Sequence, residues 1–389
     1  MSGMDKEGAM AYVHSLLHNV LKQKGSDLFV TAGAPPSVKI NGLMTPLSSQ
    51  GLSEEQARML VRSIMNDKQL RAFEEYMEGN FSISLPGSDR FRVNAFTQRG
   101  CSGMVLRHIP SEIPSFKKLG VPPVLKDITM ATRGLVIMVG ATGSGKSTTL
   151  ASMVDLRNES TQGHIITIED PIEFTHPHKK CLVTQREVGL DTDNYAIAMK
   201  NTLRQAPDVI LVGEVRDREA MEYAISYAET GHLCLTTLHA NSTNQAIDRI
   251  INFFPEERRP QLLMDLSLNL KAIVSQRLTR RRDGKGRFPA VEVMINTPMM
   301  ADLILKGDIS GMKELMAKSN QLGMCTFDQA LFQMIDAGII SVQEGMRNAD
   351  SINDLRLQLK LGSRNSKSND FFKGTEELSI EAISDEAAL

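Results

Sequence analysis

The segment that most constrains this chain is Gly140-Ala-Thr-Gly-Ser-Gly-Lys-Ser147, which matches the phosphate-loop pattern G-x-x-x-x-G-K-[ST]. Glycines let the backbone curl so that successive N–H groups point inward, and a following helix adds its positive N-terminal dipole. The apolar run 135–139 precedes the loop, and residues 148–156 have a helical pattern. This strand, loop and helix together predict a nucleoside triphosphate site rather than a glycine-rich turn that binds nothing.

The side chains of the loop have separate expected tasks. Lys146 is expected to reach the β- and γ-phosphates of ATP, and the Ser147 hydroxyl is expected to bind Mg²⁺. Backbone N–H groups supply most of the remaining contacts. The predicted nucleotide-binding residues are Gly140, Ala141, Thr142, Gly143, Ser144, Gly145, Lys146, Ser147 and Thr148.

The pattern of apolar runs predicts an α/β fold in two domains. Short apolar runs at 164–168, 209–212 and 233–238 are separated by helical stretches, which predicts a mostly parallel sheet covered on both faces. The chain has 389 residues, too many for one ordinary core. We therefore expect a small α+β domain over 1–110, a proline-rich linker over 111–123, the nucleotide-binding domain over 124–360, and a disordered, Ser-rich acidic tail over 361–389.

The composition indicates in which cellular compartment the protein works and which classes of partner it does not bind. The net charge of −2 gives no global attraction to nucleic acid, and no apolar run approaches the roughly 20 residues of a membrane-spanning helix. The four cysteines are far apart and form neither a zinc pattern nor a disulfide framework. These features predict a cytoplasmic protein that does not bind nucleic acid.

Carboxylates that follow the apolar strands are candidates for the catalytic acids. Glu214 follows the run 209–212 after one glycine, and we expect it to hold the Mg²⁺ shell and polarise a water. The segment 168–173 follows another run and contains Glu169, Asp170 and Glu173. Of these, Glu173 is predicted to orient the attacking water, with Glu169 and Asp170 as alternatives.

Two histidines flank the run 233–238. His239 is included in the predicted catalytic set, and His232 is predicted to sense whether ATP or ADP is bound. The alternative for either is a buried histidine whose hydrogen bonds are satisfied. Metal binding by the pair is not expected, since no thiolate or carboxylate lies at ligand spacing.

Three further motifs make the chain resemble a known family. Residues 203–217 resemble the signature of secretion and type IV pilus ATPases, 167–174 resemble their acidic box, and 230–239 resemble their histidine box. The resemblance runs from about residue 25 to residue 348. Within this family, the chain most resembles the PilT/PilU twitching-motility branch, and within that branch the PilU type.

The resemblance implies a PAS-like N-terminal domain and a RecA-like domain, assembled as a ring of six that hydrolyses ATP with Mg²⁺. It also implies that arginines of the N-terminal domain contact the phosphates. Arg92 and Arg107 match that stretch, with Arg99 as a further candidate. Guanidinium groups offset the charge of a transferring phosphoryl group, whereas a purely structural ion pair is the alternative for each.

Two departures from PilT make the chain resemble PilU instead, and that resemblance implies an accessory role in retraction. The segment 299–304 lacks an arginine that PilT carries after its Thr-Pro step, and the chain continues into the acidic tail. The expected function is therefore pilus retraction together with a PilT paralogue and an inner-membrane platform protein, with the ring peripheral at that membrane. A structural partner with little turnover and a DNA-transport ATPase remain alternatives. We interpret the basic stretch 277–287 as a solvated hairpin, the alternative being a contact with anionic lipid or an acidic partner.

Overall fold

The computed structural model describes residues 5–40, 42–85, 90–109 and 112–362. The described chain divides into two compact units. The first comprises the residues up to 113, together with two short later segments, 171–175 and 187–191. The second comprises 114–170, 176–186 and the residues from 192 onward. The sequence did not indicate that the two later segments pack with the first unit.

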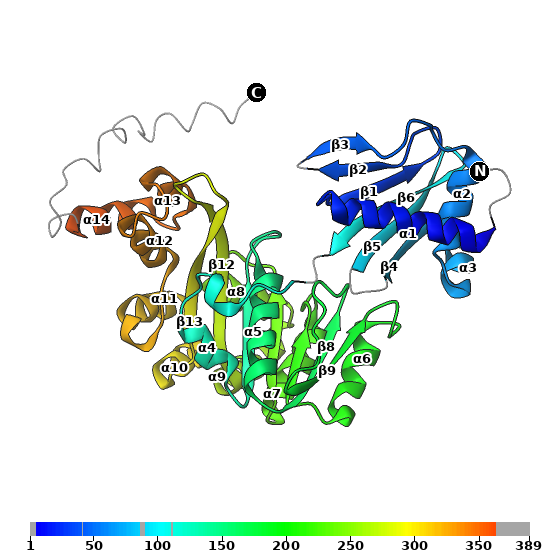
Figure 1. Cartoon of the computed structure of the whole chain (residues 1–389). Helices are drawn as coiled ribbons and strands as arrows, with labels where there is room; N and C mark the ends of the chain where they lie inside the picture. The colour runs from blue at the N-terminus through cyan, green and yellow to red at the C-terminus, as the bar shows by residue number, and fades with distance from the viewer. Residues whose placement is uncertain (1–4, 41, 86–89, 110–111, 363–389) are drawn as a thin grey trace. The chain divides into compact units, whose positions relative to one another are not determined.

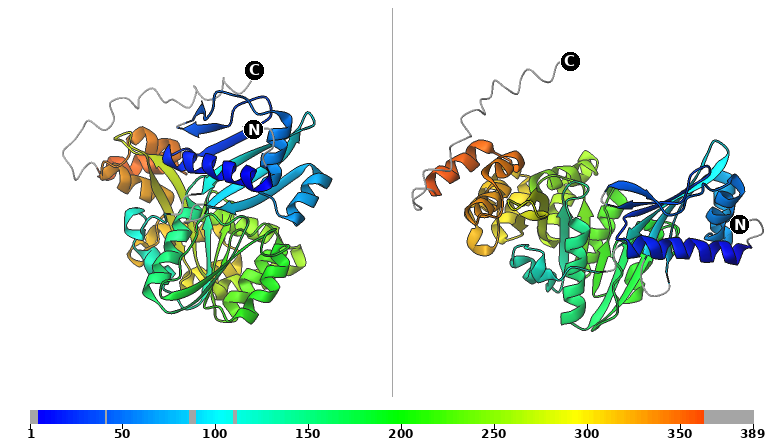
Figure 2. Two further views of the ribbon diagram at one scale, coloured as in Figure 1. Left: turned by 45° about the vertical axis from the view of Figure 1, so that its right-hand side comes forward. Right: turned by 45° about the horizontal axis from the view of Figure 1, so that its top comes forward.

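The first unit is an antiparallel sheet with helices α1 to α3 (Figures 1 and 2). Its strand order is β3-β2-β1-β6-β5-β4. The strands are β1 Asp27–Thr31, β2 Ser37–Ile40, β3 Leu43–Pro46, β4 Glu78–Ser84, β5 Arg90–Gln98 and β6 Cys101–Ile109, and the helices are α1 Lys6–Lys22, α2 Glu54–Ser63 and α3 Asp67–Tyr76.

Local sequence explains these elements. In β5, Phe91, Val93 and Ala95 are buried while the residues between them are not, so alternation directs one face of the strand to the core. Helix α2 begins with a capping box, in which Ser53 accepts from the Gln56 amide and the Gln56 side chain accepts from the Ser53 amide. Such reciprocal bonds satisfy amides that have no partner within the helix.

The second unit contains a seven-stranded sheet of order β13-β12-β7-β11-β10-β8-β9 (Figure 1). Strands β12, β7, β11, β10 and β8 pair in parallel, and β13 is antiparallel to β12. The strands are β7 Gly134–Val139, β8 Gly163–Glu169, β9 Cys181–Glu187, β10 Val209–Val212, β11 Leu233–Leu238, β12 Leu270–Arg280 and β13 Arg287–Ile295. The helices are α4 Val124–Thr129, α5 Lys146–Ser160, α6 Tyr195–Thr202, α7 Arg218–Glu229, α8 Thr243–Asn252, α9 Arg259–Asn269, α10 Pro298–Lys306, α11 Ile309–Lys318, α12 Phe327–Asp336, α13 Val342–Asn348 and α14 Ile352–Gly362.

Burial confirms the expected α/β arrangement. Every residue of β7, β10 and β11 is buried, which requires that both faces of these strands are covered. The hairpin expected near 277–287 is present, because Arg280 lies opposite Arg287 at the end where residues 281–286 join β12 to β13.

Helices α12, α13 and α14 form their own cluster at the β13 edge of the sheet, whereas α10 and α11 pack on α9 and α8 (Figure 1). Phe327 and Leu331 of α12 pack with Met346 of α13 and Leu355 of α14 in one hydrophobic core. The tail predicted over 361–389 lies outside the described residues, except that α14 continues to Gly362. Among the described helices, none is both long and apolar enough to cross a membrane.

Candidate nucleotide site

The phosphate loop joins the central strand β7, which ends at Val139, to helix α5, which begins at Lys146. Gly140, Gly143 and Gly145 have φ values of 150°, 78° and 88°, a region that favours glycine. At Gly140 a Cβ would also lie 2.5 Å from a backbone oxygen of β12. The loop therefore requires glycine for both conformation and space, and its curled backbone leads directly into a helix N-terminus.

Lys146 lies buried within this loop. Its Nζ donates to the carbonyl oxygens of Gly140 at 2.7 Å and Ala141 at 3.1 Å. Burial lowers the pKa of the Lys146 ammonium, and the negative charge of Glu214 partly offsets that effect. A polyphosphate bound at the loop would bring negative charge to an ammonium that at present has only neutral hydrogen-bond partners.

Gln276 fixes the loop from the neighbouring strand. Its Nε2 donates to the Ser144 carbonyl at 2.8 Å, and its Oε1 accepts from the Thr149 hydroxyl at 2.8 Å. One side chain thus ties β12 to the loop and to α5. Gln276 was not among the predicted site residues, since the pairing of Ser275 with Val139 that brings it here is not encoded in any local pattern.

A cavity of about 470 Å³ lies beside the loop. Its lining comes from the loop, from β12 and β13, and from two segments far along the chain. The lining residues are Gly140, Ala141, Thr142, Gly143, Ser144, Asn241, Gln276, Arg277, Leu278, Arg287 and Asn348.

Glu214 and His239 lie at the same edge of the sheet as the loop. They follow β10 and β11, which run parallel to β7 with Leu238 opposite Val139. The Nε2 of His239 lies 3.2 Å from the Glu214 carboxylate, and the Nε of Arg216 donates to the other carboxylate oxygen at 2.8 Å. The structure therefore brings together the expected Lys146, Glu214 and His239, and adds Arg216, which was not among the predicted site residues.

The predicted sensor His232 does not lie beside the phosphate loop of its own chain. His232 precedes β11, and its carbonyl accepts from the amide of Gly134 at the start of β7. Its ring lies against the Thr230 hydroxyl and the Tyr227 carbonyl, at 3.0 and 3.2 Å. A six-residue strand spans about 20 Å, so His232 lies at the opposite edge of the sheet from the loop.

The acidic segment after β8 separates into two environments. Glu169 is buried and accepts from the Thr167 hydroxyl at 2.7 Å and from Gln185 Nε2 at 3.2 Å. Asp170 lies 3.6 Å from Arg216. Glu173 instead packs with the first unit, where its carboxylate lies 3.3 Å from Arg92.

Two of the candidate arginines share one face of the first unit. Arg92 of β5 lies directly opposite Arg107 of β6. Arg107 donates to Asp27 at 2.7 Å. Burial opposes ionisation of Asp27, but hydrogen bonds from Arg107 and Ser26 outweigh it and lower the pKa of the Asp27 carboxyl. Arg99 lies in the exposed turn between the two strands and is not beside the pair.

The available oxygen ligands fit a magnesium ion held largely by the nucleotide. Ser147 in the first turn of α5 supplies a hydroxyl and Glu214 a carboxylate. Across the described stretches, no three His, Cys, Asp or Glu residues gather closely enough to hold a metal by themselves. Mg²⁺ keeps several waters and usually takes one or two protein ligands plus phosphate oxygens, in agreement with this donor set.

Comparison with known proteins places this arrangement in a family. The model of the type II/IV secretion system protein family matches residues 4–326. The chain is a member of this family. This secretion ATPase is 55% identical over 373 residues to the type IV pilus ATPase PilU of Pseudomonas aeruginosa, covering 96% of this chain and 97% of that one. It is 43% identical to the PilT retraction ATPase of the same organism, covering 87% and 98%.

Solved structures agree with the sequence relatives. The secretion ATPase matches the crystal structure of the pilus retraction motor PilT with bound ADP at a TM-score of 0.83 and 39% identity, over 89% of this chain and 99% of that one. It also matches the Legionella pneumophila ATPase DotB at a TM-score of 0.77 and 26% identity, over 87% and 94%. The fold is therefore a RecA-like ATPase domain with a smaller N-terminal domain, and the protein is an ATPase.

Proposed function

We propose that this secretion ATPase hydrolyses ATP with Mg²⁺ in a hexameric ring that drives type IV pilus retraction, as an accessory to a PilT paralogue. The observation that carries the proposal is the meeting of Lys146, Glu214 and His239 beside the phosphate loop, at the edge where β7, β10 and β11 end. The higher identity to PilU than to PilT, 55% against 43%, supports the accessory role.

The chemistry needs groups that hold phosphate and place a water. The loop amides and Lys146 bind the β- and γ-phosphates, while Ser147 and Glu214 hold the magnesium shell. Bound Mg²⁺ would neutralise charge that develops on the phosphate oxygens. His239 holds the Glu214 carboxylate in orientation through the 3.2 Å contact.

The remaining roles depend on the assembly. We assign Glu173 to orient the attacking water, and Arg92 and Arg107 to contact the phosphates of a neighbouring copy in the ring. The direct opposition of the two arginines on one sheet face supports a shared anionic target. The ring would lie in the cytoplasm against an inner-membrane platform protein and transmit the motion of its two units to that protein.

The Lys146→Ala variant tests the site. We expect the ATPase rate to fall by at least about 100-fold, because phosphate charge loses its buried counterion, with an unchanged elution volume on size exclusion. An exposed lysine of the same unit, Lys271→Ala, is the matched control and should retain wild-type turnover. Wild-type turnover in Lys146→Ala would refute the assignment.

A second candidate function is a ring partner with little turnover of its own. It is favoured by the segment 299–304 of α10, in which Met299 is largely exposed and the arginine that PilT carries after its Thr-Pro step is missing. ATPase assays of the purified protein with and without PilT decide between the two. Robust ATPase activity of this protein without PilT would reject the role of a ring partner with little turnover. A DNA-transport role is tested separately: it would be favoured if a deletion strain lost DNA transfer and kept twitching.

A further inference from the structure

Arg277 is the most heavily engaged cation at the phosphate cavity. Its Nη1 donates to the Asn348 carbonyl at 2.7 Å, and its Nη2 donates to the Asn241 carbonyl at 2.9 Å. The same Nη2 lies 2.6 Å from the carboxylate of Asp350. The guanidinium carbon lies 3.9 Å from the centre of the buried Phe327 ring. The interpretation of 277–287 as a solvated hairpin is therefore wrong for Arg277, although it holds for the exposed residues 282–287.

These partners come from two parts of the second unit. Asn241 lies two residues after His239, in the segment that joins β11 to α8. The other partners lie in the segment from α12 to α14, which we call the C-terminal helical group. Phe327 is in α12, Asn348 ends α13, and Asp350 lies in the link from α13 to α14. One guanidinium thus connects the segment that carries His239 to the C-terminal helical group.

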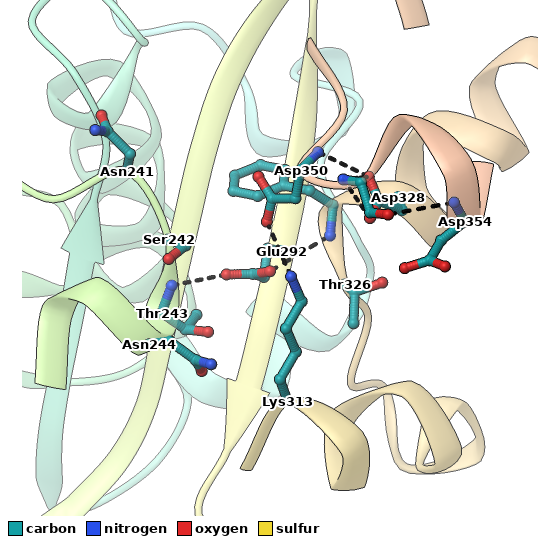
Figure 3. A network of polar contacts seen from close by, with 12 residues as sticks. Asn241, Ser242, Thr243, Asn244, Glu292, Lys313, Thr326, Asp328, Asp350 and Asp354 are labelled. Atoms are coloured by element: carbon teal, nitrogen blue, oxygen red, sulfur yellow. Dashed lines mark hydrogen bonds and ion pairs between the residues drawn. The ribbon is translucent and has the colours of Figure 1, made fainter. Parts of the chain in front are cut away.

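A buried carboxylate makes a second connection between the same two parts (Figure 3). Glu292 of β13 accepts from the amide of Thr243 at 2.7 Å and from the amide of Phe327 at 3.4 Å. These amides begin α8 and α12, so one side chain holds two helix N-termini. Burial raises the pKa of the Glu292 carboxyl, and the hydrogen bonds from Thr243 partly offset it.

Asp350 is itself held in place (Figure 3). Its backbone amide donates to Asp328 at 2.9 Å, and the amide of Ser351 donates to the same carboxylate at 3.2 Å. Lys313 lies 3.5 Å from the second oxygen of Asp350. The acceptor that Arg277 meets is therefore fixed by its own surroundings and not by Arg277 alone.

We propose that Arg277 is a positioning residue for ATP hydrolysis, which holds the 239–243 segment against the C-terminal helical group and so fixes the His239–Glu214 pair beside the phosphate loop. The C-terminal helical group is then part of the catalytic apparatus. The inference rests on the proposed ATPase site, and it extends that site to helices that do not themselves carry the predicted catalytic residues.

Arginine suits this task better than lysine. A planar guanidinium can donate to two carbonyls and a carboxylate at once while stacking on an aromatic face, whereas an ammonium is a point charge on a flexible stem. Arg277→Lys therefore keeps the charge beside the cavity but loses the geometry. That separation tests positioning rather than electrostatics.

The first experiment compares Arg277→Lys with Arg282→Lys. Arg282 lies in the same hairpin, is exposed, and has no side-chain partner among the described residues. We expect kcat of Arg277→Lys to fall about 10-fold with the KM for ATP changed less than about 3-fold, since orientation is lost and binding is retained. Arg282→Lys should match the wild type. Equal kcat values for all three proteins would overturn the proposal.

A double-mutant cycle with His239→Gln separates positioning from general destabilisation. If Arg277 acts through the His239–Glu214 pair, Arg277→Lys should reduce kcat by less than about 2-fold once His239 is replaced. Multiplicative losses in the double variant would mean that Arg277 does not act through His239. Asp350→Asn is the second variant, because Asp350 lies outside the cavity lining and should still lower kcat in the same non-additive way.

Hydrogen exchange of the nucleotide-free protein gives a readout that does not depend on turnover. Peptides covering 239–245 should exchange faster in Arg277→Lys than in Arg282→Lys, and unchanged exchange there would overturn the proposal. If the wild type failed to bind a fluorescent ATP analogue with Mg²⁺, the proposed function would fail. The exchange comparison would still report whether Arg277 holds the segment.

Discussion

At the scale of single residues, the space around Gly213 explains why the first carboxylate after β10 is at position 214. Position 213, which directly follows the strand, is occupied by glycine. Its φ is ordinary, but a Cβ would lie 3.1 Å from the Tyr195 hydroxyl and 3.2 Å from the Cα of Glu169 and the carbonyl oxygen of Ile168. A side chain at position 213 would therefore push the end of β8 back by a few tenths of an ångström. Glu214 is the first residue after the strand that carries an acid, and it does so without this crowding.

Replacing Gly213 with alanine should displace the end of β8 and with it the carboxylates of the site. We expect the ATPase rate of Gly213→Ala to fall about 10-fold, with a loss of about 1–3 kcal/mol in the free energy of unfolding from overpacking. Steady-state kinetics and urea unfolding measure the two effects. Gly79→Ala is the control, because a Cβ at Gly79 meets only ordinary contacts of 3.6 Å or more. A Gly213→Ala enzyme with wild-type turnover would contradict the explanation.

His176 should make the stability of the second unit depend on pH. Burial lowers the pKa of His176 from 6.5 to about 4, and its Nδ1 has no partner among the described residues. Below pH 6.5 the unfolded chain takes up a proton that the folded chain refuses, so the free energy of unfolding falls as the pH drops toward 4.

The matching variant is His176→Leu, which cannot titrate. Between pH 7 and pH 5 the wild type should lose about 2 kcal/mol more free energy of unfolding than His176→Leu. Urea unfolding at the two pH values, followed by circular dichroism, measures this difference. Parallel losses in both proteins would show that His176 titrates normally in the folded state.

At the scale of elements, strand β12 does more than extend the sheet. Gln276 holds the phosphate loop and α5, while Arg277 on the next position holds two segments from elsewhere in the chain. Because successive residues of a strand point to opposite sides, one strand can organise the loop on one side and the C-terminal helices on the other.

Gln276→Ala should loosen the loop before nucleotide binds. It leaves the Ser144 carbonyl and the Thr149 hydroxyl without their partner, at a cost of about 1–3 kcal/mol for a buried polar group. We expect the Kd for ATP to rise about 10-fold, measured by titration calorimetry. Lys271→Ala, on the exposed part of the same strand, should leave the Kd unchanged. An unaltered Kd in Gln276→Ala would mean that the loop keeps its shape without β12.

At the scale of the whole molecule, the first unit includes two segments that come much later in the sequence, 171–175 and 187–191. Glu187 is buried, and it accepts from the Ser82 hydroxyl at 2.9 Å and from the amide of Ile172 at 3.2 Å. It also forms an ion pair with Arg90. The buried counterion of Arg90 in the first unit is therefore Glu187, a residue 78 positions after the last strand of that unit ends at Ile109.

Glu187→Ala should destabilise the first unit selectively. The variant leaves Arg90 largely buried without its carboxylate, which costs about 3–5 kcal/mol when a buried pair is broken. Hydrogen exchange should show faster opening of β4 and β5 with little change in β7 and β11. Replacement of the exposed Glu75 by alanine should alter neither, and slow exchange throughout the first unit of Glu187→Ala would refute this role.

The sequence was most informative where one segment determines its own conformation. The apolar run of β7, the glycine loop and the start of α5 were all predictable, because strand, turn and helix signals are local. Gln276 and Arg277 were not, since their neighbours come from strand register and from loops more than 30 residues away. His232 shows the same limit: two histidines that flank one strand look equivalent in sequence, and only strand direction separates them.

The hydrogen bonds of Arg277 restrict which sequence changes this protein can tolerate during evolution. Two of its three hydrogen-bond acceptors are backbone oxygens, those of Asn241 and Asn348, so the identity of those side chains can drift without breaking it. Length cannot drift in the same way, because a single inserted residue between His239 and Asn241, or before Asn348, would move the carbonyl out of reach. We therefore expect insertions and deletions, rather than point replacements, to break the hydrogen bonds by which Arg277 links the 239–243 segment to the C-terminal helical group.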